Sequence, residues 1–336
     1  MEALRYGVIG VGHIAQHAHL PGLAPLVEAG EVRLEAFCDP NEELLQEQVA
    51  RWGARKAFTD HHAMFEQTEL DAVYLLVPPT LHTDVEYLAA ERGTALFVEK
   101  PQTLDMAQAY AFEKAIREAG IVSQVGFMSR YYPAAEKLQQ LLAERRPQHV
   151  NVQLFYSGAP IRFWTSRMDL CGGSFVENTI HTVDLIRSVL GDIVATSAFY
   201  VPRREGDKDR GPMNLPHAYL VNYRFTEDRA GNFTTSRCLT EAGVSRRDIA
   251  IVSEDSLIEW SSRRILENGQ VVWEEDPPSN AFALQAAAFA RAVRAGDPTA
   301  PRSPYSDALN SLQAVLAANY SAARGGELVS VRDFVG

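Results

Sequence analysis

The sequence predicts an α/β protein with two domains. Residues 1–125 are expected to form a doubly wound parallel sheet, and residues 126–336 an α+β domain with a mostly antiparallel sheet. The length of 336 residues exceeds what one hydrophobic core usually supports. Strand-like and helix-like runs alternate from Leu4 to Val125, as in a parallel sheet covered by helices on both faces. After Gly126 the pattern changes to the alternation of half-exposed strands.

Short apolar runs between helical patterns define the strands of the first domain. We predict these strands at Arg5–Ile9, Arg33–Cys38, Ala72–Val77, Ala95–Val98 and Ile121–Val125. The segments between them predict helices at Ile14–Ala29, Glu42–Trp52, Leu81–Arg92 and Leu104–Ala119. Each helix follows a strand, which is the order that a parallel sheet requires.

In the second domain, apolar and polar residues alternate with the period of strands that bury one face. The predicted strands are Val150–Tyr156, Ala218–Phe225, Gly231–Leu239, Ile249–Val252, Ser256–Trp260 and Gln270–Trp273. Helices are predicted at Pro133–Glu144, Ala281–Ala295 and Tyr305–Ala323, and over residues 172–184, where apolar side chains form a buried stripe.

Composition and charge narrow the classes of partner. The chain carries a net charge of −11, and its arginines form isolated pairs instead of a basic patch. Nucleic acids and anionic membranes are therefore not expected as partners. No apolar run approaches the length of a membrane span or a signal segment. The three cysteines lack metal-ligand spacing and are odd in number, which favours a reducing, cytoplasmic compartment.

A glycine loop follows the first strand and opens the first helix. Gly10 and Gly12 leave room for backbone amides to approach a pyrophosphate, and Ala15 takes the third small position. His13 and Ile14 lie at the start of the helix, whose dipole also favours the anion. Tight strand-to-helix turns use glycine for other reasons as well, but this strand-loop-helix context predicts dinucleotide binding.

Asp39 ends the second strand, 24 positions beyond Ala15, near the place where an acid receives the adenosine ribose hydroxyls. A carboxylate there would repel a 2′-phosphate, and Pro40 and Asn41 follow it where an arginine would favour one. We therefore expect NAD to be preferred, with NADP possible as cofactor. The simpler interpretation is that Asp39 only starts the turn before the next helix.

Two further strand ends face the same crevice of a doubly wound sheet. Pro78 and His82 follow the third predicted strand and are candidates for cofactor contacts, although His82 could instead be an ordinary residue at a helix start. Glu99 and Lys100 follow the fourth predicted strand, just before Pro101. Both are candidate cofactor-binding residues, and the Lys100 ammonium could also hydrogen-bond a substrate hydroxyl. A side-chain ion pair between them is geometrically poor, because adjacent residues on a strand point apart.

Glu177 and His181 are spaced so that an α-helix would bring them to one face. An imidazole oriented by Glu177, or by Asp184 one turn later, could accept a proton. A histidine beside a buried stripe is more often a hydrogen-bonded core residue, and a metal site of these three residues is not favoured. Asn178, next to Glu177, is a candidate for substrate binding.

Arg130, Arg162 and Trp164 lie near the predicted domain junction. Guanidinium donors and an aromatic face could hold a polyhydroxylated ligand there, so all three are candidate substrate-binding residues. Arginines in such places are at least as often surface or interdomain groups.

No metal is expected among the remaining histidines. His13, His17 and His19 resemble a ligand cluster, but a cation in a phosphate loop would compete with the purpose of the glycine turn. His61 and His62 are expected at a helix start, in contact with solvent.

Together, the loop at residues 10–15, the Cys38-Asp39-Pro40 turn, residues 77–82, Glu99-Lys100-Pro101 and residues 172–184 resemble the glucose-fructose oxidoreductase and inositol dehydrogenase (Gfo/Idh/MocA) family. The resemblance implies a Rossmann domain followed by an open-faced sheet domain, homo-oligomers such as dimers or tetramers, and sugar or cyclitol substrates. It also implies that Lys100 positions and polarises the reacting hydroxyl while His181 takes its proton during hydride transfer.

One departure is that the family usually has aspartate where this chain has Glu177, which makes the identity of the substrate less certain. A reductase of an unsaturated or aromatic substrate is the alternative within the enzyme class. A dinucleotide-binding regulator without turnover is the alternative outside it.

Overall fold

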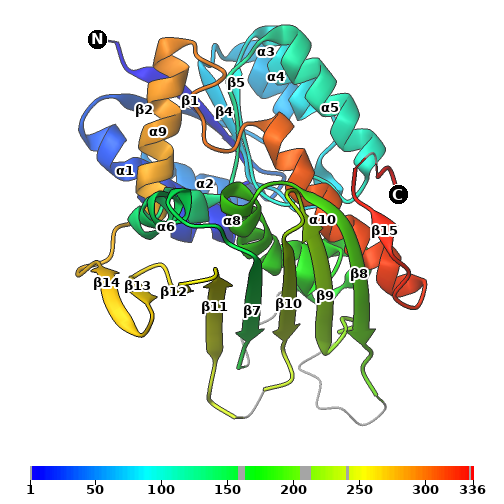
Figure 1. The fold of residues 1–336 in the computed structure, drawn as a ribbon. Helices are drawn as coiled ribbons and strands as arrows, with labels where there is room; N and C mark the ends of the chain where they lie inside the picture. The colour runs from blue at the N-terminus through cyan, green and yellow to red at the C-terminus, as the bar shows by residue number, and fades with distance from the viewer. Residues whose placement is uncertain (1, 158–162, 205–212, 240–241, 333) are drawn as a thin grey trace. The chain divides into compact units, whose positions relative to one another are not determined.

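The structure is a computed structural model that describes residues 2–157, 163–204, 213–239, 242–332 and 334–336 (Figure 1). The chain forms two compact units, each built from separate segments. The first unit comprises residues 1–103, 107–131 and 280–308, and the second comprises 104–106, 132–279 and 309–336. The sequence analysis divides the chain once, after residue 125. In the structure the first unit also contains residues 280–308, and the second unit also contains residues 104–106.

A six-stranded parallel sheet in the order β3-β2-β1-β4-β5-β6 forms the centre of the first unit (Figure 1). Its strands are β1 (Leu4–Ile9), β2 (Val32–Cys38), β3 (Lys56–Phe58), β4 (Ala72–Leu75), β5 (Ala95–Val98) and β6 (Ser123–Val125). Every residue of β4 and β5 is buried, as expected for central parallel strands covered on both faces. The strand order reverses between β1 and β4, and ligands of doubly wound sheets bind beyond the carboxyl ends at such a point.

Six α-helices and three shorter helical turns accompany this sheet. The helices are α1 (Leu20–Glu28), α2 (Glu42–Trp52), α3 (His61–Gln67), α4 (Val85–Arg92), α5 (Met106–Ala119) and α9 (Ala281–Ala295). The turns are η1 (Ala15–His19, π-helical), η2 (Pro79–Leu81) and η3 (Met128–Tyr131). Helix α9 packs on α1 at Gly22, where a Cβ would lie 3.0 Å from the carbonyl carbon of Phe282. A segment almost at the other end of the chain thus completes the core of the first unit.

The five strands predicted for this part of the chain are confirmed, with small shifts at their ends. The sequence analysis missed β3, because a three-residue edge strand is too short to show a period. It expected a helix start at His61 and His62 without giving the helix bounds, and α3 begins there. The predicted helix Leu81–Arg92 begins only at Val85, since Pro78 and Pro79 lead the chain into the turn η2 first.

The second unit contains a nine-stranded sheet in the order β14-β13-β12-β11-β7-β10-β9-β8-β15. The strands are β7 (His149–Phe155), β8 (Ile193–Val201), β9 (Ala218–Phe225), β10 (Ala230–Ser236), β11 (Arg246–Val252), β12 (Leu257–Trp260), β13 (Arg264–Glu267), β14 (Gln270–Glu274) and β15 (Val329–Ser330). All neighbouring pairs are antiparallel except β7 with β10. The predicted mostly antiparallel sheet is confirmed, and β8, β13 and β15 are strands that the sequence analysis missed.

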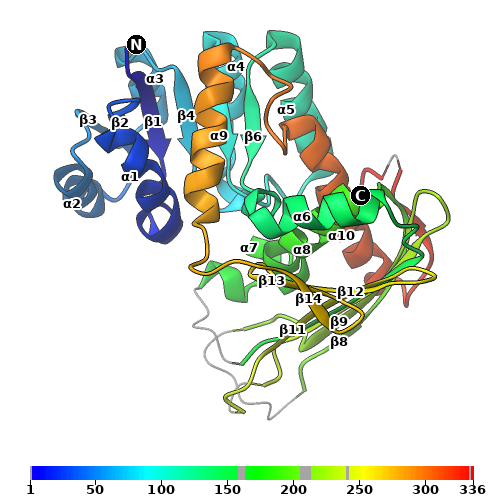
Figure 2. The ribbon, with the colours of Figure 1, turned by 60° about the vertical axis from the view of Figure 1, so that its left-hand side comes forward.

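Helices cover one face of this sheet. These are α6 (Pro133–Ala143), α8 (Ile180–Leu190) and the part of α10 (Tyr305–Ala323) that belongs to the second unit. Figure 2 shows α6 and α8 on the same side of the strands. Along β7 the side chains of Val150, Val152 and Leu154 are buried, whereas those between them are half-exposed. On the uncovered face Phe199 is 55% and Leu220 39% exposed, so the sheet is open-faced.

A buried polar cluster joins α8 to α10. Ser311 Oγ donates to Asp184 Oδ1 at 2.7 Å and accepts from Arg187 Nε at 2.9 Å. The Asp184 side chain is fully buried among these groups. Asp184 therefore supports the packing of the two helices. Across the described ranges, no helix combines the length and apolar character needed to cross a bilayer.

Gly10 is the position of the first unit where an added side chain would cost most. Its φ is +86°, and a Cβ there would lie 2.7 Å from the Leu76 carbonyl oxygen. Nothing lies within 4 Å of the corresponding position on Gly12. We expect Gly10→Ala to lower the free energy of unfolding by about 1–3 kcal/mol. Gly12→Ala should change it by less than about 1 kcal/mol. Urea unfolding followed by circular dichroism tests both, and equal stability of the two variants would contradict the expectation.

Candidate functional site

The glycine loop leads directly from β1 into η1. The Gly10 amide donates to the Cys38 carbonyl at 2.8 Å, and the Val11 amide donates to Asp39 Oδ2 at 3.0 Å. These bonds tie the loop to the end of β2, so the turn is fixed from its neighbour in the sheet. Gly12 faces open space, which leaves its backbone accessible to a ligand. His13 and His17 stack on each other with ring centroids 4.0 Å apart.

Asp39 lies at the carboxyl end of β2, as predicted. Besides accepting from Val11, its carboxylate accepts from the Asn41 amide through Oδ1 at 2.9 Å. Asn41 in turn caps α2 through the Leu44 amide. Each carboxylate oxygen can accept a second hydrogen bond, so Asp39 still has acceptors for hydroxyl groups. The turn role and the ligand role that the sequence suggested are therefore compatible.

Glu99 is buried behind Lys100. Its Oε1 lies 2.6 Å from Nε2 of His19, and the two side chains are 7% and 3% exposed. Its Oε2 accepts from the backbone amide of Lys100 at 2.9 Å. A Cβ on Gly126 would lie 2.8 Å from Oε1, so that glycine makes room for the carboxylate. Glu99 thus fixes the backbone of Lys100 directly after β5.

The predicted contact residue His82 is also buried. Its Nδ1 lies 2.8 Å from Glu86 Oε1, and neither side chain is exposed. His82 follows η2, and its carbonyl accepts from Gln108. Pro78 precedes η2 and bends the chain at the end of this strand. His82 therefore fixes the end of η2 through its buried contact with Glu86.

Arg130 makes contacts within the first unit. Its guanidinium lies 2.7 Å from Asp307 Oδ2 and also donates to the carbonyl of Arg302. The Arg302 guanidinium donates in return to the carbonyl of Arg130 and lies over the ring of Tyr131. The Arg130 side chain is 9% exposed and joins η3 to the first turn of α10 and to the segment before it, which matches the structural role that the sequence left open.

Glu177 and His181 lie on a helix whose first turn departs from α geometry. Residues Phe175–Thr179 form the π-helical turn η5, and α8 begins at Ile180. The prediction of a regular α-helix was wrong here, because a π turn closes after five residues and shifts the spacing of side chains. The turn starts after Gly172 and Gly173, which both have positive φ. Both Glu177 and His181 are partly exposed.

The other candidate substrate residues are spread over the second unit. Asn178 lies in η5 and is partly exposed, and Trp164 begins the turn η4 (Trp164–Ser166). Arg162 lies outside the described residues. Cys171 ends the short helix α7 (Met168–Cys171), and burial raises the pKa of its thiol to about 11. That thiol stays protonated near neutral pH and is no nucleophile.

Three residues near η5 were missed by the sequence analysis. The guanidinium carbons of Arg237 and Arg247 lie 5.0 and 5.2 Å from the ring centroid of Tyr156. Arg237 Nε also donates to Ser174 Oγ at 2.7 Å, immediately before η5. No local pattern marks these residues, because the pairing of three strands brings them together.

One further group offers metal-ligand atoms. Among the residues that the structure describes, only His61, His62 and Asp84 bring three such atoms together. The Nε2 atoms of the histidines lie 2.8 and 3.1 Å from the two oxygens of Asp84. Burial pushes the pKa of Asp84 upward, but hydrogen bonds from His61 and Thr83 lower it below its usual value. The sequence analysis expected the two histidines to contact solvent. In the structure both also contact the Asp84 carboxylate.

The residues at the end of β1 and β2 fit a dinucleotide. Gly12 leaves the space that a pyrophosphate needs beside backbone amides, and Asp39 keeps acceptors for ribose hydroxyls. Lys100 follows β5 at the same edge of the parallel sheet. The glycine loop, the Asp39 carboxylate and the Lys100 ammonium therefore follow strands that end at one edge of the sheet.

Known proteins resemble the chain in structure and in sequence. A WlbA dehydrogenase from Bordetella pertussis, solved in complex with NADH and UDP-GlcNAcA, superposes with a TM-score of 0.83 over 98% of this chain and 99% of that one. At 23% identity, this likeness establishes the fold. A D-xylose 1-dehydrogenase (NADP(+)) from Haloferax volcanii is 24% identical over 331 residues, covering 96% of this chain and 98% of the relative.

A scyllo-inositol 2-dehydrogenase (NAD(+)) from Bacillus subtilis is 29% identical over 197 residues. That alignment covers 56% of this chain and 54% of the relative, so the chain matches about half the length of that protein. Residues 4–127 match the sequence model of the oxidoreductase family with an NAD-binding Rossmann fold. In these residues the chain resembles the Gfo/Idh/MocA oxidoreductases.

Proposed function

We propose that the protein is an NAD-dependent oxidoreductase that transfers a hydride between nicotinamide and the hydroxyl- or keto-bearing carbon of a sugar, sugar derivative or cyclitol. The observation that carries this proposal is the position of Lys100. It follows β5 at the edge of the sheet where β1 ends in the glycine loop, and buried Glu99 holds its backbone. Relatives that act on scyllo-inositol and D-xylose support the class of substrate.

The cofactor side of the reaction is assigned to the first unit. The backbone around Gly12 binds the pyrophosphate, and Asp39 binds the ribose hydroxyls. The bound nicotinamide supplies the hydride acceptor for oxidation and the hydride donor for reduction. Pro78 and His82 shape the turn beside it, and the Asp39 carboxylate disfavours the 2′-phosphate of NADP.

The substrate side of the reaction involves Lys100 and His181. During oxidation, the Lys100 ammonium donates a hydrogen bond to the substrate hydroxyl and stabilises negative charge developing on its oxygen. His181 takes the hydroxyl proton while the carbon loses its hydride, so a ketone or lactone forms. Glu177, in the π turn before α8, orients the imidazole of His181. Asn178 and Trp164 contribute further contacts to the substrate.

The uncovered face of the nine-stranded sheet is assigned to a homo-oligomer. Phe199 and Leu220 are large apolar residues exposed there, on adjacent strands β8 and β9. Burial of such residues against a second copy would remove apolar surface from water. The net charge of −11 supports the expectation that nucleic acids and anionic membranes are not partners.

Lys100→Ala and His181→Ala should each lower kcat for sugar oxidation by about 100- to 10,000-fold, the range typical of lost proton-transfer and charge-stabilising groups. NAD affinity should change by less than about threefold, since the lost contacts concern the transition state. Steady-state kinetics at the nicotinamide absorbance and fluorescence titration with NADH measure the two effects. Lys114→Ala, at a 66% exposed side chain on α5, is the control. Full activity of either active-site variant would refute its role.

The pH profile of oxidation tests the base. A histidine that accepts the proton must be neutral in the free enzyme, so kcat/KM should fall as pH drops below about 6–7, where imidazoles ordinarily titrate. The His181→Gln variant should retain a low rate without this acid limb. A wild-type profile that stays flat down to pH 5 would argue against His181 as the base.

Asp39→Asn tests the choice of cofactor with little change in shape. The amide oxygen can still accept from Val11, so the glycine loop stays tied to β2, while the bond from the Asn41 amide is lost. Loss of the charge should reduce kcat/KM with NAD about 10-fold or more and improve the ratio for NADP, because hydrogen bonds to charged groups are the stronger ones. Parallel assays with NAD and NADP measure the ratio. An unchanged ratio would remove Asp39 from ribose recognition.

A further inference from the structure

Two arginines and a tyrosine form a cluster at one end of the second unit's sheet. Strand β7 pairs with β10 on one side and β11 on the other, and Phe155 is in register with Ser236 and Arg246. Tyr156 follows Phe155, and Arg237 follows Ser236. Arg247 is in register with Leu154, the residue before Phe155. Both guanidinium groups therefore lie over the ring of Tyr156, with their carbons 5.0 and 5.2 Å from its centroid. We call these three residues the arginine pair with its tyrosine.

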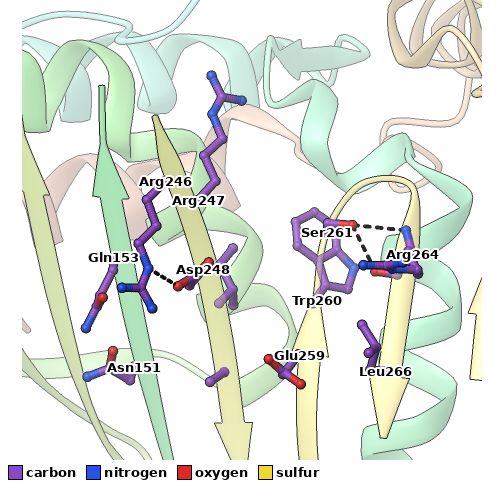
Figure 3. Close-up of a pocket in the computed structure, with 12 residues that line it drawn as sticks. Asn151, Gln153, Arg246, Arg247, Asp248, Glu259, Trp260, Ser261, Arg264 and Leu266 are labelled. Carbon is purple, nitrogen blue, oxygen red and sulfur yellow. Dashed lines mark hydrogen bonds and ion pairs between the residues drawn. The ribbon is translucent and has the colours of Figure 1, made fainter. Parts of the chain in front are cut away.

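Neither guanidinium forms an ion pair with a carboxylate among the residues that the structure describes. Arg237 is only partly exposed and spends one of its five donors on Ser174 Oγ, at 2.7 Å. Its other donors remain available for a planar anion. Arg246, the residue before Arg247, behaves differently, because its Nε donates to Asp248. Figure 3 shows the side chains of Arg246 and Arg247 leaving β11 in opposite directions.

The cluster adjoins the helix that carries the proposed base. Ser174, which accepts from Arg237, immediately precedes η5 and lies three residues before Glu177. Burial raises the pKa of Tyr156, whereas the charges of Arg247 and Arg237 lower it and that of Glu177 raises it. Glu177 is therefore within electrostatic reach of the Tyr156 ring that both arginines contact. The cluster and the proposed substrate residues of this unit belong to one region.

We propose that Arg237 and Arg247 form a subsite for an anionic group, so that the preferred substrate is a sugar derivative carrying a carboxylate or a phosphate. This inference rests on the proposed function, because it assigns a contact to the same substrate. Guanidinium groups bind carboxylate and phosphate oxygens in pairs, and stacking on Tyr156 holds their planes in place. Two adjacent positive charges also offset locally the negative charge of the whole protein.

The experiment compares ligands that share a ring and differ in one group. D-Glucose, D-glucuronate and D-glucose 6-phosphate form one set, and D-galactose with D-galacturonate forms a second. Isothermal titration of the protein saturated with NADH measures binding without turnover, and nicotinamide absorbance with NAD measures kcat/KM. We expect at least one anionic member to bind, and to be oxidised, at least 10-fold better than its neutral partner. The carboxylate and phosphate members distinguish the two sources of charge.

Variants assign the effect to the arginine pair. Arg237→Gln and Arg247→Gln should each weaken binding of the anionic member about 10- to 100-fold, the range for hydrogen bonds to charged groups, and change that of the neutral member less than about threefold. Arg246→Gln is the matched control, since that side chain points away and pairs with Asp248. Arg237→Lys keeps the charge without the planar fork, and it should recover only part of the affinity. Circular dichroism and thermal midpoints establish that each variant folds.

The outcomes separate this inference from the proposed function. Turnover of neutral sugars without preference for their anionic partners would overturn the subsite and leave the dehydrogenase intact. Tight binding of an anion that depends on Arg237 but leads to no turnover would support the subsite and count against the enzyme. Equal losses for neutral and anionic ligands in Arg237→Gln would show a structural role and overturn the inference.

Discussion

The buried pair of His19 and Glu99 joins the segments on which the cofactor side depends. His19 closes the π-helical turn after the glycine loop, and Glu99 ends β5, so one short contact links the phosphate loop to the backbone of Lys100. A buried carboxylate is costly unless its oxygens are satisfied, and here the imidazole and the Lys100 amide provide the partners. Movement of the loop or of the strand end would leave that carboxylate unsatisfied.

The first unit is closed by chain that arrives late in the sequence. The Gly22 contact with Phe282 seats α9 on α1, and the Ser303 hydroxyl donates to the carbonyl of Val125 at the end of β6. The amide of Val125 donates back to the carbonyl of Ser303. Residues 280–308 thus cover the nucleotide-binding sheet, although they follow all the strands of the second sheet but β15. Each unit takes segments from both sides of the other along the chain, so neither unit folds from a single uninterrupted stretch.

Local pattern predicted the features that repeat along the chain. Five of the six strands of the first sheet, the glycine loop, Asp39 and the position of Lys100 follow from periodicity and from the rule that strand ends share an edge. The burial of Glu99 and His82 did not, because their partners His19 and Glu86 become visible only once the sheet is folded. Arg237 and Arg247 are 10 residues apart and are brought together by their pairing with β7. The π turn before His181 was missed because five residues of ordinary helical composition carry no sign of a changed hydrogen-bond register.

That π turn separates two tasks that a regular helix would couple. Helix α8 presents a fully buried side to its own unit, including Val183, Leu185 and Ile186, and this packing fixes its rotation. In an ordinary helix the same rotation would dictate the heading of every upstream side chain, at about 100° per residue. The wider turn η5 breaks that dependence, because its hydrogen bonds close after five residues. Its residues Phe175 and Val176 still pack in the core, while the partly exposed Glu177 and Asn178 take headings that the rotation of α8 alone does not dictate.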